Sequence, residues 1–306
     1  MAKILVATEK PFANEAVNGI RSIVENAGFE LMLLEKYKDK KDLLDAVTDA
    51  DALIVRSDIV DEDVLNAAKR MKIVVRAGAG YDNIDLEACK SHNVIAENTP
   101  GQNSNAVAEL VFGMAVMAAR NMYSGTSGFE LKGKKLGIQA FGQVGRNVAR
   151  IAKGFDMKVE ALDPYCPDKV MEDAGVMPVH SLENLYQSND FVSIHIPATP
   201  ETIGSIGYDL ISSMPKNGVL INTARKEVVD ETALEEALAN RPDLKYVADV
   251  RPNNAAQLES RFPGQVFFTP KKMGAQTSEA NINAGLAAAT QVVEFLRDGV
   301  VRFKVG

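Results

Sequence analysis

The sequence predicts an α/β protein built from two doubly wound parallel sheets, each in its own domain. Short β-branched and apolar runs alternate with helical patterns along almost the whole chain. This alternation is typical of parallel strands joined by right-handed crossover helices. A chain of 306 residues is also long for a single hydrophobic core, which favours two domains. The turn residues Asn98-Thr99-Pro100-Gly101 interrupt the alternation and mark a boundary.

The elements follow one another in a regular order. Before the boundary, strands are expected at residues 4–7, 31–34, 52–55, 73–75 and 94–97, with helical patterns between them, such as residues 15–27 before Gly28. After it, a helix at residues 104–120 is apolar nearly all round and is expected to be buried, either in the core or in a subunit interface. Further strands are expected at residues 136–140, 158–162, 191–194, 219–221, 246–250 and 266–268. A last apolar helix at residues 284–296 follows the final strand, from where it can return to pack on the first domain.

Composition excludes several classes of function. Hydrophobic residues make up 46% of the chain and charged residues 25%, with a net charge of −7, which argues against nucleic acid or an anionic membrane as partner. Two cysteines lie far apart, and neither a signal peptide nor a membrane span is evident, so a cytoplasmic location is expected. The three histidines have no metal-binding spacing, so no metal is expected.

The stretch from Leu136 to Asp163 predicts a dinucleotide site. A strand runs into the turn Phe141-Gly142-Gln143-Val144-Gly145, and a helix and a second strand follow. Gly142 would let the backbone approach a pyrophosphate, and Gly145 would let the helix pack close to the strand. The N–H groups of the first helical turn, which contains Gln143 and Val144, favour an anion.

The end of the second strand favours NAD over NADP. Asp163 stands about twenty residues beyond the turn, where a carboxylate accepts hydrogen bonds from the adenosine ribose hydroxyls. No arginine follows it directly, and a carboxylate repels a 2′-phosphate. One residue departs from the pattern, because Ala140 stands where the first glycine is usual.

Polar residues at the carboxyl ends of the strands are the candidates for substrate chemistry, because ligands of open parallel sheets bind there. Arg225 closes an apolar strand beside small residues, which distinguishes it from an ordinary surface arginine. Gly78 and Gly80 are either simple turn glycines or part of an N–H cradle for a carboxylate. The other strand-ending segments are Arg56-Ser57, Arg76-Ala77-Gly78-Ala79-Gly80, Asn222-Thr223-Ala224-Arg225, Asp249 and Lys271-Lys272.

At these residues the chain resembles the NAD-dependent dehydrogenases specific for D-2-hydroxy acids, and among them the 3-phosphoglycerate dehydrogenases. The likeness covers almost the whole chain, and its signatures include Ile54-Val55-Arg56-Ser57, Asn98-Thr99-Pro100-Gly101-Gln102-Asn103-Ser104 and Gly274-Ala275-Gln276-Thr277. The resemblance implies a Rossmann NAD-binding domain, residues 98–282, inserted into a flavodoxin-like substrate domain, residues 1–97 and 283–306. It implies an active site in the cleft between the two domains, and a homodimer formed through the nucleotide domains. The C-terminal regulatory domains of longer members are expected to be absent.

The resemblance also implies roles for individual residues. Arg225 would hold the substrate carboxylate and carbonyl, helped by the N–H groups of Gly78 and Ala79. Arg56, Ser57 and Asn103, with help from Asn281, would bind a distal phosphate, for which an arginine, a hydroxyl and an amide are suited. The implied cofactor-binding residues are Gly142, Gln143, Val144, Gly145, Asp163, Pro197, Thr223, Ala224, Asp249, Gly274 and Ala275.

The chain departs from the family pattern at the acid/base. The family's histidine falls on Lys272 when the segment is aligned from Gly274-Ala275, and on Lys271 when it is aligned from Pro270; we prefer Lys272. The glutamate that orients that histidine falls on Asn254. The joint loss is chemically consistent, since a lysine base needs no carboxylate but does need a pKa well below about 10.4. Burial in a closed cleft and repulsion from Arg225 and Lys271 are expected to lower it.

The sequence therefore favours NAD-dependent oxidation of 3-phosphoglycerate to 3-phosphohydroxypyruvate, the entry step of serine synthesis, with Lys272 as acid/base. One alternative is a hydroxypyruvate or glyoxylate reductase of the same family, which has no phosphate to bind. Another is a non-catalytic NAD-sensing protein, which the loss of the histidine and glutamate would suggest.

Overall fold

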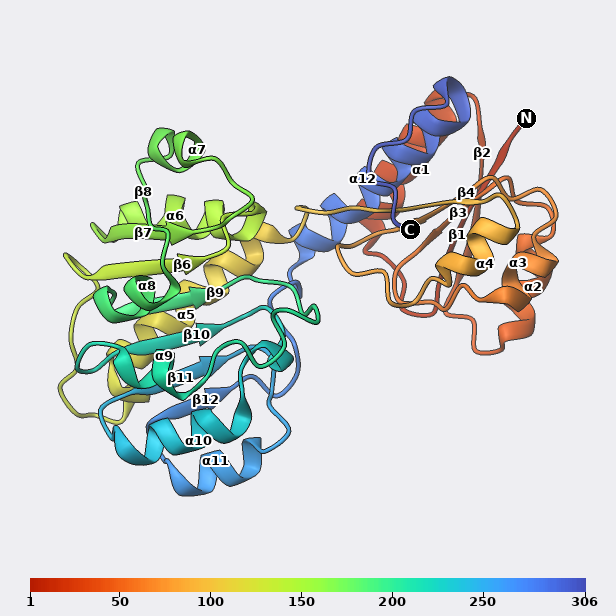
Figure 1. Cartoon of the computed structure of the whole chain (residues 1–306). Helices are drawn as coiled ribbons and strands as arrows, with labels where there is room; N and C mark the ends of the chain where they lie inside the picture. The colour runs from red at the N-terminus through yellow and green to blue at the C-terminus, as the bar shows by residue number, and fades with distance from the viewer. The chain divides into compact units, whose positions relative to one another are not determined.

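A computed structural model describes residues 1–306 and divides the chain into two compact units (Figure 1). Unit 1 comprises Met1–Asn103 and Gln276–Gly306, and unit 2 comprises Ser104–Ala275. The chain thus leaves unit 1 once and returns to it. The unit boundaries follow residues 103 and 275, whereas the expected boundaries followed residues 97 and 282. None of the helices combines the length and apolar composition needed to cross a lipid bilayer.

Unit 1 is built on a parallel five-stranded sheet with the order β2-β1-β3-β4-β5. This is the flavodoxin-like strand order, in which ligands bind at the carboxyl ends near the β1/β3 switch point. Its elements are β1 (Lys3–Thr8), α1 (Asn14–Asn26), β2 (Glu30–Glu35), α2 (Lys40–Val47), β3 (Ala52–Val55), α3 (Glu62–Ala67), β4 (Ile73–Arg76), α4 (Leu86–Ser91), β5 (Ile95–Asn98) and α12 (Ser278–Asp298).

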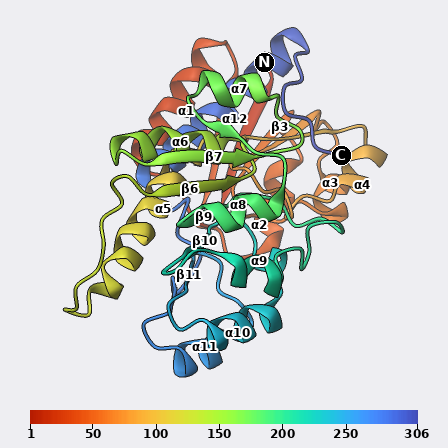
Figure 2. The same cartoon turned by 60° about the vertical axis from the view of Figure 1, so that its left-hand side comes forward.

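Helices cover both faces of this sheet. Alternate strand residues face opposite ways, so that Leu5 and Leu53 pack toward α2, α3 and α4, whereas Ile4 and Ile54 pack toward α1 and α12. The helices α1 and α12 lie side by side in both views (Figures 1 and 2). Strands buried on both faces become almost continuously apolar, which is the pattern that the sequence shows.

Unit 2 contains a parallel seven-stranded sheet with the order β12-β11-β10-β9-β6-β7-β8. Six of these strands follow the Rossmann order, with the switch point between β6 and β9, and β12 extends one edge. The elements are α5 (Ser104–Ala119), η1 (Asn121–Tyr123), β6 (Lys135–Gln139), α6 (Gln143–Gly154), β7 (Lys158–Leu162), α7 (Asp168–Asp173), β8 (Met177–Pro178), α8 (Leu182–Ser188), β9 (Phe191–Ile194), α9 (Tyr208–Ser213), β10 (Val219–Asn222), η2 (Lys226–Val228), α10 (Glu231–Asn240), β11 (Lys245–Ala248), α11 (Ala255–Arg261) and β12 (Val266–Phe268).

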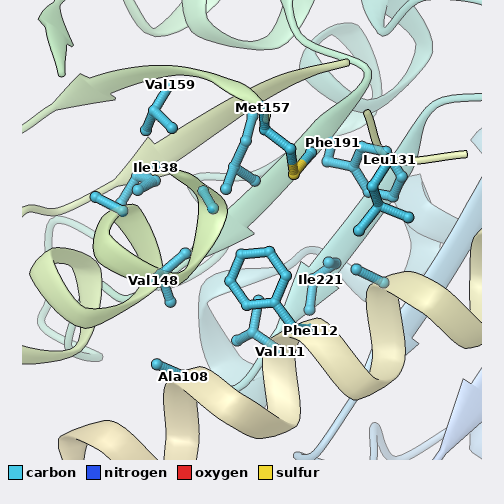
Figure 3. Close-up of a cluster of buried hydrophobic side chains, with 14 of the residues drawn as sticks. Ala108, Val111, Phe112, Leu131, Ile138, Val148, Met157, Val159, Phe191 and Ile221 are labelled. Carbon is cyan, nitrogen blue, oxygen red and sulfur yellow. The ribbon is translucent and has the colours of Figure 1, made fainter. Parts of the chain in front are cut away.

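The unit 2 core also forms two layers. On one face α5 and α6 cover β6, β7, β9 and β10, and Figure 3 shows Val111 and Phe112 of α5 pointing into this cluster beside Val148 and Ile221. The opposite face packs on α8 to α11. There α10 and α11 lie together in both views, joined by an ion pair between Arg261 and Glu235 (Figures 1 and 2).

The predicted fold class, two parallel-sheet α/β domains, is confirmed. Two local features differ from what the sequence led us to expect. The two-residue strand β8 was not predicted, because Met177–Pro178 is too short to show a pattern. The helix α5 is not buried on all sides of the chain, since Asn105, Glu109 and Gly113 form an exposed stripe along it. The other alternative, that the exposed side of α5 is covered in a subunit interface, stays a prediction.

Candidate active site

The turn between β6 and α6 leaves the N-terminus of a long helix open. Gly142 is the N-cap of α6, and no side chain accepts a hydrogen bond from the first turn. A Cβ added at Gly142 would meet no atom within 4 Å. The N–H groups of the first turn, which contains Gln143 and Val144, therefore face open space together with the positive end of the helix dipole. This geometry fits the pyrophosphate of a dinucleotide.

The same turn brings α6 very close to β6. A Cβ added at Gly145 would lie 2.3 Å from the carbonyl oxygen of Ala140, which is backbone and cannot move aside easily. Only glycine fits at this position. Ala140 itself has a φ of 80°, a left-handed conformation that explains why a glycine is usual there.

Asp163 follows β7 and is fixed by two backbone donors. Its Oδ2 accepts a hydrogen bond from the N–H of Phe141 at 2.8 Å, and its Oδ1 accepts one from the N–H of Tyr165 at 2.9 Å. Each carboxylate oxygen has a second lone pair, so the group can still accept hydrogen bonds from ribose hydroxyls. Asp163 thus also ties the ends of β6 and β7 together, a structural role that the sequence did not indicate.

A buried asparagine shapes the turn that carries Arg225. The Oδ1 of Asn222 accepts from the N–H of Ala224 at 2.9 Å, and its Nδ2 donates to the carbonyl of Arg225 at 2.9 Å. Asn222 has no exposed surface. Arg225 is exposed, forms no ion pair, and donates from Nη1 to the carbonyl oxygen of Ala224 at 2.9 Å.

Lys272 reaches the same carbonyl oxygen from the loop after β12. Its Nζ lies 3.4 Å from the Ala224 oxygen, so an ammonium and a guanidinium group converge on one atom at the carboxyl edge of the sheet. Lys271 is exposed and does not join them. The contact is made by Lys272, the lysine that we preferred from the sequence, and its role as acid/base stays a prediction.

No other group supplies an obvious acid/base. Desolvation by burial lowers the pKa of His195, at the end of β9, to about 3, so its imidazole stays neutral near pH 7. His92 of unit 1 pairs with Glu62, and His180 of unit 2 pairs with Asp168. Asn254 is the N-cap residue of α11, and its buried Oδ1 has no hydrogen-bond partner.

The remaining predicted cofactor residues lie along the same edge of unit 2. Pro197 is in the exposed loop after β9, and Thr223 is buried beyond β10 with an unpartnered Oγ1. Asp249, which follows β11, is buried, and so is Gly274. Ala275 is the last residue of the unit.

In unit 1 the structure joins two of the residues expected to bind a phosphate. Arg56 follows β3, and its Nη2 donates to the Oδ1 of Asn281 at 2.7 Å, while its Nη1 donates to the carbonyls of Lys10 and Pro11. Ser57 is exposed next to it. No hydrogen bond joins Asn103 to this group.

Arg76, at the end of β4, belongs to the same group; it stands among the strand-ending residues named from the sequence, which gave it no role of its own. Its Nε donates to the carbonyl of Arg56 at 2.9 Å. Burial lowers the pKa of both guanidinium groups, and at Arg76 the charge of Arg56 adds to the effect. Neither arginine forms an ion pair with a carboxylate, so the two charges together favour an anion. Its position at a strand end, like that of Arg56, was the available signal.

The expected carboxylate cradle at Gly78 and Ala79 is partly occupied by the chain itself. The N–H of Gly78 donates to the carbonyl of Arg76 at 2.9 Å, which leaves the N–H of Ala79 as the donor. Gly78 has a φ of 152°, and a Cβ there would lie 1.7 Å from a guanidinium nitrogen of Arg76. Glycine is therefore needed to make room for this arginine.

Comparison with known proteins identifies the family. Residues 105–270, more than half of the chain, match the family profile of the NAD binding domain of D-isomer specific 2-hydroxyacid dehydrogenases. The chain belongs to this family. Unit 2 is therefore its NAD-binding domain, in agreement with the open N-terminus of α6.

Individual relatives agree with this assignment. The chain is 46% identical to 3-phosphoglycerate dehydrogenase of Entamoeba histolytica, whose crystal structure contains NAD⁺, over 100% of this chain and 98% of that one, with a TM-score of 0.86. It is 37% identical to D-3-phosphoglycerate dehydrogenase of Methanocaldococcus jannaschii over 84% of this chain and 52% of the relative. It is 32% identical to hydroxypyruvate reductase of Thermotoga maritima over 97% and 99%. The chain spans about half the length of several of the curated relatives that it matches.

Proposed function

We propose that this chain catalyses the reversible NAD-linked oxidation of 3-phosphoglycerate to 3-phosphohydroxypyruvate, the entry step of serine synthesis. The observation that carries the choice of substrate is the pair of neighbouring guanidinium groups in unit 1. Arg56 and Arg76 have no carboxylate partner, and Asn281 contacts Arg56. A dianionic phosphate would satisfy both charges, whereas the hydroxyl group of hydroxypyruvate would satisfy neither. Ser57, Asn103 and the N–H of Ala79 are the further donors that we assign to the substrate.

The catalytic groups come from unit 2. Bound NAD supplies the hydride acceptor, or in its reduced form the donor. Lys272 takes the proton of the substrate's C2 hydroxyl during oxidation and returns it during reduction. Arg225 holds the substrate carboxylate and polarises the C2 carbonyl. Their convergence on the Ala224 carbonyl supports this assignment, because both cations can then reach substituents of one carbon atom.

Lys272 requires a neutral amine for part of the cycle. Its side chain is exposed in unit 2. We propose that bound substrate and cofactor exclude water from the amine, which favours its neutral form.

The second candidate is a reductase for hydroxypyruvate or glyoxylate. It is favoured by the Thermotoga maritima relative, which is named hydroxypyruvate reductase and matches this chain over nearly its whole length.

We also propose a homodimer, supported by the partly buried apolar residues Leu110, Val116 and Met117 on α5. Sedimentation of the whole protein at twice the 33.1 kDa of one chain would support it. We further propose a cytoplasmic location.

Turnover of NADH with phosphohydroxypyruvate, hydroxypyruvate and glyoxylate tests the activity. We expect Arg56→Ala and Arg76→Ala each to raise KM for phosphohydroxypyruvate at least about tenfold, since a charge-assisted hydrogen bond contributes about 1.5–3 kcal/mol. KM for hydroxypyruvate should stay unchanged in both variants. Arg21→Ala, which removes an exposed arginine of α1 paired with Glu25, is the matched control. An unchanged KM for the phosphorylated substrate favours the reductase.

Replacing the acid/base tests the mechanism. Lys272→Met should lower kcat about 10²–10⁴-fold, the usual contribution of a general acid/base, while Lys271→Met should change it little. An unchanged rate in Lys272→Met would refute the role. If the native protein binds NADH, measured by its fluorescence, but reduces none of the three keto acids, the NAD-sensing alternative replaces the enzyme.

A further inference from the structure

The carboxylate of Asp249 lies beneath the loop that carries Lys271 and Lys272. It is only 1% exposed. Its Oδ1 accepts hydrogen bonds from the Oγ1 of Thr269 at 2.8 Å and from the N–H of Met273 at 2.7 Å. Its Oδ2 accepts one from the N–H of Gly274 at 2.8 Å. One side chain thus binds both ends of the loop.

The loop closes on this carboxylate with no space to spare. A Cβ added at Gly274 would lie 3.0 Å from the Oδ2 of Asp249 and 3.1 Å from a methyl carbon of Val107. At the other end, the N–H of Thr269 donates to the carbonyl of Ala248 at 3.1 Å. The exposed residues Pro270, Lys271 and Lys272 lie between these anchors.

The Asp249 carboxylate is the acceptor in all three of these hydrogen bonds. An ionised carboxylate, which has no proton of its own to donate, matches three converging donors. Most of its hydrogen-bonding capacity is therefore used by the chain, and a single lone pair on Oδ2 is left for a cofactor. This differs from the purely cofactor-binding role that the family resemblance implies.

We propose that Asp249 is a positioning residue for Lys272. By holding the N–H of Met273, the next residue along, it fixes the backbone from which the lysine side chain extends to the Ala224 carbonyl, 3.4 Å from Nζ. Asn222 does the same for the turn that carries Arg225. Two buried polar side chains at adjacent strand ends thus set the separation of the two cations. The effect of this positioning on catalysis rests on the proposed function, in which Lys272 is the acid/base.

Asp249→Asn tests the proposal. In one of its two orientations the amide places an N–H group against the N–H of Gly274, and in the other against the donors on Oδ1, so the loop loses at least one hydrogen bond. We expect kcat to fall at least about thirtyfold, as for loss of a supporting interaction around a catalytic group, while KM for NADH changes less than about threefold. Asp243→Asn, which removes a carboxylate paired with Arg241 before β11, is the control and should leave kcat unchanged.

A second measurement does not depend on turnover. Limited acetylation of the whole protein, followed by mass spectrometry, reports the reactivity of Lys272 relative to the exposed Lys41 and Lys132. We expect the relative rate at Lys272 to change at least threefold in Asp249→Asn and not in Asp243→Asn. If Asp249→Asn does not fold, Thr269→Val, which removes one donor to the same carboxylate, should show a smaller change in the same direction.

The outcomes separate the two proposals. A raised KM for NADH with an unchanged kcat would overturn the positioning role in favour of direct cofactor contact, as would a folded variant with unchanged kcat and unchanged acetylation of Lys272. If the native protein reduces none of the keto acids, the proposed function fails, but the acetylation result still decides whether Asp249 positions Lys272.

Discussion

Ala140 shows how a single residue constrains the cofactor turn. Its φ of 80° is unfavourable for any residue with a Cβ. The residue cannot relax, because its N–H donates to the carbonyl of Leu162 at 2.9 Å and its own carbonyl lies against Gly145. The chain therefore retains strain at a position where glycine would be free of it.

Ala140→Gly should accordingly stabilise the protein. Removing the Cβ from a left-handed residue stabilises the fold by about 1–2 kcal/mol. The greater conformational freedom of glycine in the unfolded chain offsets part of this gain. We therefore expect the free energy of unfolding to rise by about 0.5–1 kcal/mol. Urea unfolding followed by circular dichroism measures it. Ala149→Gly, in the middle of α6, is the control and should destabilise. A loss of stability in Ala140→Gly would contradict the argument.

At the scale of elements, the cofactor site depends on how closely α6 approaches β6. The contact is made at Gly145, where a Cβ would meet the Ala140 carbonyl oxygen at 2.3 Å and the Cγ2 of Ile138 at 3.1 Å. Since the first turn of α6 also presents the N–H groups that we propose to bind the pyrophosphate, we expect a shift of the helix to change stability and cofactor binding together.

Gly145→Ala should cost about 1–3 kcal/mol of unfolding free energy, as overpacking of a tight contact does, and should weaken NADH binding. Fluorescence titration with NADH and urea unfolding give the two quantities. The chain offers a matched control in Gly154, at the other end of α6, where a Cβ would meet nothing within 4 Å. Gly154→Ala should stabilise slightly and leave NADH affinity unchanged. Equal effects of the two substitutions would exclude the proposed close contact.

At the scale of the whole molecule, distant parts of the sequence meet at β5. Residues near the C-terminus pair with this strand, through an antiparallel bridge between Glu97 and Lys304 and a hydrogen bond from the N–H of Val305 to the carbonyl of Ala96 at 2.9 Å. Glu97 is fully buried there. Its Oε1 accepts from the N–H of Arg302 at 2.8 Å, while its Oε2 has no partner.

This arrangement makes stability depend on pH. Burial raises the pKa of Glu97, so the folded protein binds this proton more tightly than the unfolded chain does. Its contribution is fully present below the unfolded pKa, and it is lost as the pH rises through the folded pKa. We expect Glu97→Gln to raise the free energy of unfolding at pH 8 by about 1 kcal/mol and to reduce its loss between pH 5 and pH 8.

Urea unfolding at the two pH values is the measurement. Glu294→Gln is a control of opposite sign, because a hydrogen bond from Arg302 lowers the pKa of Glu294, and its charged form therefore stabilises the fold at pH 8. A variant Glu97→Gln that is less stable than the native protein at pH 8 would contradict the expected effect of the buried charge.

Much of the architecture could be predicted because it depends on local patterns. Four strands, β3, β7, β9 and β12, begin and end at the predicted residues, since buried parallel strands are continuous apolar runs bounded by turn residues. The short β8 has no such run. In the candidate site, the rule that functional residues follow strands indicated Arg56, Arg225 and Lys272. The same rule placed Arg76 among the candidates, but nothing in the sequence showed that it would lie against Arg56.

Local patterns along the chain predicted two parallel α/β domains, a candidate nucleotide-binding turn and a set of cationic residues at strand ends. These features follow from periodicity, from glycines and from the order of residues along the chain. The tertiary structure decided which groups meet. Arg76 lies against Arg56, and Lys272 rather than Lys271 reaches the Ala224 carbonyl beside Arg225. Asp249 is buried beneath the loop that carries the two lysines. Such contacts join residues far apart in the chain, and their distances depend on how strands and loops pack rather than on any local pattern.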